Sequence, residues 1–267
     1  NRTTPTPMDS PPGFGNWPPA PTPTIRTAVD LLNPTPQHHP AVKVRNFGKA
    51  KVKMPDGLDV GGESGLDVLI VKGFYHHLYR LPEAIKANAP EARIAECTRR
   101  DLPKEYADLF KYDVVVLADM GADAWDADGH KRLADYVGAG GRLVVLGGPF
   151  TLGQGYFKGT ALERVLPVEV RMARDIYRLQ EPLAIGNAKL SAFTGRPLLY
   201  YYHAVRPKAD SKVRLWAGKL PVLLERKVGK GQVLVFIGTV LGDPQNKAET
   251  PFWEWKDWAR TLGKLIL

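Results

Sequence analysis

The sequence predicts an α/β fold: a mostly parallel sheet with helices on both faces, antiparallel C-terminal extensions and a Pro-rich N-terminal arm. Two observations lead to this prediction. From Asp67 onward short apolar runs alternate with helical patterns, and the run at 143–146 leads into a glycine-rich turn. This alternation is typical of parallel strands covered on both faces. With 267 residues, 44% of them hydrophobic, the chain can form one such domain with extensions.

Residues 1–40 are rich in proline and are expected to form an extended arm. Proline lacks an N–H donor and favours polyproline-like geometry, so this segment should not fold by itself. It contains two large aromatic residues, Phe14 and Trp17. The segment is either a plain linker or an arm that becomes ordered against a partner protein or a second copy of the chain, with these aromatics as anchors.

Residues 41–65 are predicted to be a basic hairpin followed by a linker. Apolar and basic residues alternate over 41–54 around a turn at 46–48, and 57–65 is rich in glycine. The α/β domain is expected over 66–267.

The first half of the domain should supply parallel strands and their helices. Strands are predicted at 67–72, 92–96, 113–119 and 142–148, and helices at 78–88, 103–110, 127–139 and 160–166. Acidic residues in 123–128 resemble a calcium loop only superficially, because the twelve-residue pattern and its terminal Glu are missing. Acidic residues at the start of a helix explain them better.

The second half is predicted to be richer in strands. They are expected at 167–171, 198–203, 213–217, 221–227 and 232–238, as antiparallel extensions of the main sheet, with a tight turn at 229–231. The chain closes with apolar residues at helical spacing, which predict a helix docked on the core. These residues are Phe252, Trp255, Trp258, Leu262 and Leu265.

The turn after the strand at 143–146 has the position of a nucleophile elbow but carries no nucleophile. Hydrolases of several classes place a Ser or Cys in such a turn, next to backbone N–H donors. Here Gly147, Gly148 and Pro149 fill it, and the single thiol, Cys97, lies far upstream.

Several motifs in fixed order resemble the class I glutamine amidotransferase-like superfamily, in particular its trehalose-utilisation-type branch. They are YDVVVLAD at 112–119, DYVGAGGRLVVLGG at 135–148, GQGYFKGTALERVLPVEV at 153–170, GKGQVLVFIGT at 229–239 and PFWEW at 251–255. The resemblance spans Asp67 to the C-terminus. It implies a flavodoxin-like doubly wound sheet with a functional pocket at the strand ends.

The chain departs from that family at two points of the catalytic triad. Amidotransferases carry a Cys in the elbow and a His after a late strand, so that an adjacent base generates the thiolate. Here the elbow has glycines, and the late strand leads into Thr239, Val240 and Leu241. Glutamine hydrolysis by that mechanism is excluded, and no catalytic residue is assigned.

A candidate pocket is predicted at the strand ends. The resemblance places a histidine after the first strand, which matches His76 and His77. Other residues that follow strands or lie in the glycine-rich loop complete the set: Asp119, Gly147, Gly148, Gln154 and Tyr156. The alternative is that one histidine packs against the next helix while the other faces water. We expect neither a metal nor a cofactor, since neighbouring rings diverge and no third ligand is evident.

The remaining histidines have no evident partner: His38 and His39 lie in the Pro-rich stretch, His130 on a predicted surface helix, and His203 after three tyrosines.

One cysteine excludes a disulfide framework. Net charge is +9, yet no nucleic-acid motif accompanies it, so nucleic-acid binding is not expected. No apolar run is long enough to span a membrane. The chain begins with Asn rather than Met. Export followed by signal-peptide removal is one explanation, and a sequence trimmed or given only in part is another. The sequence leaves the location open and favours an extracytoplasmic one.

Two functions remain open from the sequence. The first is a non-catalytic amidotransferase-like domain that serves binding and assembly, with its arm on a partner protein. The second is a carbohydrate-binding or carbohydrate-processing protein that holds a small sugar in the strand-end pocket.

Overall fold

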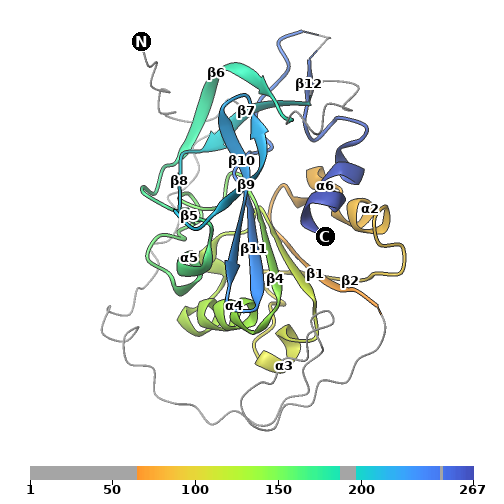
Figure 1. Cartoon of the computed structure of the whole chain (residues 1–267), viewed down its shortest axis with the longest axis vertical. Helices are drawn as coiled ribbons and strands as arrows, with labels where there is room; N and C mark the ends of the chain where they lie inside the picture. Colours follow the sequence, from red (N-terminus) through yellow and green to blue (C-terminus); the bar gives the residue numbers. More distant parts are fainter. Residues whose placement is uncertain (1–64, 187–196, 247–248) are drawn as a thin grey trace.

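The computed structural model describes residues 65–186, 197–246 and 249–267, which form an α/β fold around a seven-stranded sheet (Figure 1). The arm at 1–40, with Phe14 and Trp17, and the hairpin predicted at 41–54 lie outside these residues. Among the described residues, no helix has both the length and the apolar character needed to cross a membrane.

The sheet has the strand order β2-β1-β3-β4-β11-β10-β9. Its first five strands run parallel, which is the flavodoxin-like arrangement that the sequence predicts. Their bounds are β1 Asp67–Lys72, β2 Arg93–Thr98, β3 Val114–Ala118, β4 Arg142–Leu146 and β11 Gly231–Phe236. All residues of β3 are buried, as expected for a strand covered on both faces.

One predicted strand direction was wrong. The strand at 232–238 was expected as an antiparallel extension, but β11 pairs in parallel with β4, from Gln232 opposite Arg142 to Phe236 opposite Leu146. The reason is the predicted turn at 229–231, which reverses the chain between β10 and β11 and so aligns β11 with the parallel strands. The true antiparallel extensions are β9 Lys212–Ala217 and β10 Leu220–Val228.

Other late strands leave the main sheet, contrary to the prediction. β7 Pro197–His203 joins β6 Ile176–Ala184 and β12 Thr250–Pro251 in a three-stranded sheet, and β5 Val168–Glu169 pairs with β8 Arg206–Pro207. The end of β7 hydrogen-bonds to the segment after β11 at two places: His203 N donates to Ile237 O, and Thr239 N donates to Tyr201 O. These bonds hold the smaller sheet at the carboxyl edge of the main one.

Helices cover both faces of the main sheet (Figure 1). α2 Leu81–Lys86 packs with α6 Trp258–Ile266 on one face, while α3 Tyr106–Leu109, α4 Ala127–Ala139 and α5 Ala161–Val165 lie on the other. The helix predicted at 78–88 is divided into a 3-10 turn, η1 His76–Tyr79, and α2, because Arg80 adopts a left-handed conformation with φ 49°. A second 3-10 turn, η2 Ala122–Ala124, precedes α4. Asp126 caps α4 by accepting a hydrogen bond from Gly129 N, as the acidic helix start predicts.

The C-terminal helix docks on the core but starts later than the apolar spacing indicates. Phe252 and Trp255 are buried in the turns before the helix, whose first residue is Trp258. The rings of Phe252 and Trp258 meet with centroids 4.7 Å apart. Leu265 is only partly buried, and Ile266 takes its place in the core.

Candidate functional site

The turn after β4 lies at the carboxyl edge of the parallel strands, where open α/β sheets bind ligands. Gly147, Gly148 and Pro149 are all buried there. The end of β3 brings Asp119 to the turn, and the end of β1 brings the segment 73–75. The groups that surround this elbow therefore decide what chemistry the edge supports.

Asp119 joins three strand ends through its carboxylate. Its side chain is buried, and its backbone is left-handed, with φ 51°. Oδ2 accepts a hydrogen bond from Tyr75 N at 2.9 Å, and Oδ1 accepts one from Phe150 N at 2.9 Å. The carboxylate thus occupies one backbone donor on the segment after β1 and one on the segment after β4.

The same carboxylate fills the space where a nucleophile would stand. A Cβ atom placed on Gly148 would lie 2.2 Å from Asp119 Oδ1 and 2.7 Å from Asp119 Cβ. Real Cβ atoms do not approach other atoms this closely, so no Ser or Cys fits at Gly148 while Asp119 keeps its position. Position 148 therefore lacks a nucleophilic side chain and also has no space for one.

Burial shifts the pKa values of two ionisable side chains at this site. Burial raises the pKa of Asp119 to about 6, although the N–H groups of Phe150 and Tyr75 and the nearby His203 oppose the shift. Tyr79 is also buried beneath the turn, where its hydroxyl donates to Gly147 O at 2.5 Å. Burial, and then the negative charge of Asp119, raise the pKa of Tyr79 well above its usual value, so Tyr79 stays a neutral donor.

A buried histidine–aspartate pair contacts the elbow and the loop that follows it. His203 Nδ1 lies 3.0 Å from Asp175 Oδ1, and His203 Nε2 lies 3.1 Å from Gly148 O. Both neighbours are acceptors, whereas a neutral imidazole ring has a single N–H donor. Both contacts can be hydrogen bonds only if the ring or the carboxyl group carries one additional proton. Asp175 also accepts from Gly153 N and Gln154 N. The pair therefore fixes the glycine-rich loop to the elbow.

Sequence reasoning missed this pair. His203 was left without a partner, because Asp175 lies on a different strand connection 28 residues away and no local spacing links them. His130 lies on the helix predicted for it, α4, but its side chain is buried and its Nε2 contacts Ala122 O at 2.7 Å, a partner that the sequence does not indicate. The 3-10 turn that covers His130 has no clear sequence signature.

The other predicted pocket residues make separate contacts. His76 Nδ1 contacts Gly73 O at 2.7 Å, and His77 is exposed, with the two rings nearly perpendicular. Gln154 reaches Asp175 through its backbone, and Tyr156 is half-buried in a left-handed conformation with φ 61°. Among the residues described, no three His, Cys, Asp or Glu side chains are placed to hold a metal ion.

Cys97 cannot replace the missing nucleophile. It is buried on β2, the edge strand of the main sheet, and its thiol forms no contact with a histidine within the described part of the chain. Burial, followed by the charge of Asp101, raises the pKa of Cys97 to about 11. The thiol is therefore protonated and unreactive at neutral pH.

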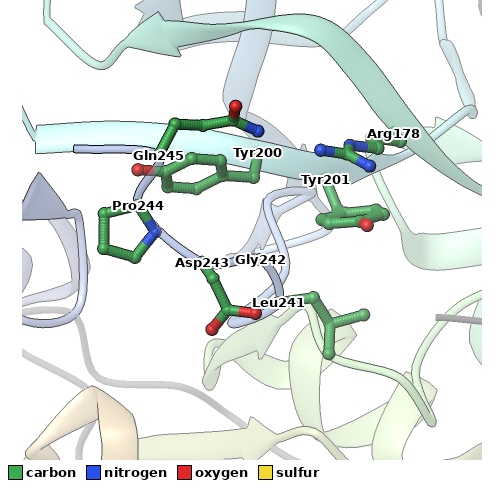
Figure 2. Close-up of a pocket in the computed structure, with 8 residues that line it drawn as sticks. All are labelled: Arg178, Tyr200, Tyr201, Leu241, Gly242, Asp243, Pro244 and Gln245. Carbon is green, nitrogen blue, oxygen red and sulfur yellow. The ribbon is translucent and has the colours of Figure 1, made fainter. Parts of the chain in front are cut away.

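A cavity lies between the smaller sheet and the loop after β11 (Figure 2). It has a volume of about 280 Å³ and is lined by Arg178 of β6, Tyr200 and Tyr201 of β7, and residues 241–245. A second cavity of about 300 Å³ continues along β6 and shares Arg178, Tyr200 and Gln245 with the first. None of the strand-end residues predicted from the sequence lines either cavity.

The sequence model of the family described as "Putative glutamine amidotransferase" matches residues 62–266. The chain belongs to this family. The amidotransferase-like assignment agrees with the resemblance seen in the sequence, and the match begins close to the first described residue.

Two solved structures share the fold of the described residues. The cytoplasmic protein STM3548 from Salmonella typhimurium is similar with a TM-score of 0.61 and 17% identity, over 75% of this chain and 97% of that one. The cytoplasmic protein STM1381 from Salmonella typhimurium LT2 also has a TM-score of 0.61, with 20% identity, over 75% of this chain and 99% of that one. A search of curated proteins found no match. At these identities the likeness concerns the fold alone.

Proposed function

We propose that this chain is a non-catalytic member of the amidotransferase-like family that acts as a binding and assembly module, with its N-terminal arm on a partner protein. One observation carries the non-catalytic part: the Asp119 carboxylate occupies the volume that a nucleophile on Gly148 would need. Glutamine hydrolysis of the family type requires that nucleophile.

Two further observations support an inert elbow. Phe150 N, a backbone donor beside the turn, is already engaged by Asp119 Oδ1. An oxyanion hole needs such donors directed at the reacting oxygen. The segment after β11 supplies Thr239, which is buried, and no histidine base. The elbow therefore lacks the nucleophile, the segment after β11 lacks the histidine found there in the family, and the Phe150 donor is occupied.

The assembly part of the proposal rests on the sequence of the arm. Forty residues rich in proline cannot bury enough apolar surface to fold alone, yet they contain Phe14 and Trp17. Large aromatic residues supply much of the energy of protein interfaces. The carbohydrate alternative has less support, because Asp119 is engaged by backbone donors and His77 faces solvent.

Site-specific photo-crosslinking in the full chain tests the proposal. A benzophenone amino acid is placed at Phe14, at Trp17 or, as a control, at the exposed Glu91, in the cells that make the protein. We expect one defined protein adduct from positions 14 and 17 and none from position 91. Equal, diffuse labelling at all three positions would refute an arm that holds a partner. Glutamate release from glutamine by the purified chain would refute the non-catalytic assignment separately.

A further inference from the structure

The cavity between the smaller sheet and the loop after β11 has walls from two different parts of the fold. Arg178 lies directly opposite Tyr201 in the β6–β7 ladder, so both side chains share one face of the smaller sheet. The register of this ladder shifts immediately after Arg178, an irregularity of the kind that often redirects side chains at binding sites. The facing wall is the loop 241–245 after β11.

This loop is held in place without help from a ligand. Gly242 has φ 107°, and a Cβ there would lie 2.5 Å from Tyr200 Cβ, so the backbone packs directly on the tyrosine. At the other end, Gln245 N donates to Glu249 Oε2 at 2.9 Å, and the Tyr200 hydroxyl donates to the same oxygen at 3.0 Å. A loop held at both ends offers a preformed wall, which lowers the entropic cost of binding.

Two opposite charges face this cavity without neutralising each other. Figure 2 shows Arg178 on one side of the cavity, Asp243 on the other and Tyr201 between them. Among the described residues, neither Arg178 nor Asp243 makes an ion pair or a side-chain hydrogen bond. Burial raises the pKa of Tyr201, which Arg178 opposes and Asp243 reinforces, so both charges act on the same ring. The positive and the negative group thus lie on either side of one buried tyrosine.

We propose that this cavity binds a small zwitterion, with the ligand carboxylate on Arg178 and the ligand ammonium group on Asp243. Guanidinium groups bind carboxylates through paired, charge-assisted hydrogen bonds, and a carboxylate is the matching acceptor for an ammonium group. A volume of about 280 Å³ suits a molecule of a few heavy atoms between its two charges. The inference is independent of the proposed function, since it needs neither the elbow nor the arm.

Calorimetric titration of the full chain with a series of ω-amino acids tests the proposal and measures the distance between the two charges. The series runs from glycine through β-alanine and 4-aminobutyrate to 6-aminohexanoate. We expect one length to bind best. Butyrate and butylamine, which each lack one charge, should bind about tenfold to a hundredfold more weakly, as expected when one charge-assisted contact is lost.

Variants locate the site. Arg178→Gln and Asp243→Asn should each lower the affinity for the best ligand by about tenfold or more. Arg174→Gln, at an exposed arginine outside the cavity lining, should leave the affinity unchanged. Arg178 and Asp243 are exposed, so unchanged melting temperatures are expected and would exclude misfolding. Equal binding of butyrate and 4-aminobutyrate, tighter binding of glucose or trehalose, insensitivity to both variants, or no binding along the series would each overturn the proposal.

Discussion

Alanine at position 148 should destabilise the fold through a clash with one side chain. The new Cβ would lie 2.2 Å from Asp119 Oδ1 and 2.4 Å from Asp119 Cγ, so the carboxylate would have to move. Gly148 is not among the residues with positive φ, and alanine therefore adds no backbone strain of its own. The three nearest atoms all belong to Asp119, so we expect most of the cost to come from displacing it.

The structure sets the size of this effect. Moving Asp119 breaks its hydrogen bonds from Tyr75 N and Phe150 N, each 2.9 Å long. Hydrogen bonds to charged groups contribute about 1.5–3 kcal/mol each, so Gly148→Ala should lower the free energy of unfolding by about 3–6 kcal/mol. In an Asp119→Gly background the obstacle is gone, and the same alanine should cost less than about 1 kcal/mol. Glycine is needed at 119 because the Asp119 Cβ itself would lie 2.7 Å from the new methyl group.

Urea unfolding followed by tryptophan fluorescence measures all four proteins of this double-mutant cycle. A matched control is Gly138→Ala in α4, where a Cβ meets no atom within 4 Å; it should be neutral or stabilise by up to about 1 kcal/mol. Additive effects of the changes at 148 and 119, with no coupling energy, would refute the argument that Asp119 closes the elbow.

Three further results are expected. Because the folded-state pKa of Asp119 is raised to about 6 by burial, its protonation stabilises the fold below the unfolded pKa, and this contribution is lost as pH rises through about 6. Relative to Asp119→Asn, the parent chain should lose about 3 kcal/mol between about pH 4 and pH 7 in urea titrations, and parallel pH profiles would contradict this. Asp175→Ala should cost about 3–5 kcal/mol in the same assay, because it removes the oxygens that contact buried His203 and accept from Gly153 N and Gln154 N; a loss below about 1 kcal/mol would show that the pair does not brace the loop. Cys97 should react with a thiol reagent far more slowly in the folded chain than in urea, since its pKa is about 11, and equal rates would disprove its shielding.

Much of the parallel sheet could be predicted from the sequence, because each strand is a continuous apolar run between turn signals. β1, β3 and β4 are such runs, and α4 has an acidic cap before it and glycines after it. β6 was missed because Arg178, Gln180 and Glu181 make it look like an exposed loop. The strands of the smaller sheet pair over long sequence distances, which periodicity alone does not reveal.

The candidate site was only partly predictable for the same reason. The elbow, the missing nucleophile and Asp119 follow from local patterns at strand ends. The brace of Asp175 and His203, and the cavity between Arg178 and Asp243, depend on where the smaller sheet lies relative to the main one. No spacing in the sequence contains that information.

The contacts around Asp119 and Asp175 also bear on motion. Loops at the ligand-binding edge of a protein usually belong to its least stable parts. Here the amides of Tyr75, Phe150 and Gly153 donate to carboxylates that are shielded from water. Their hydrogens should exchange with deuterium as slowly as those of the central strands, so flexibility at this edge would belong to other segments than the elbow.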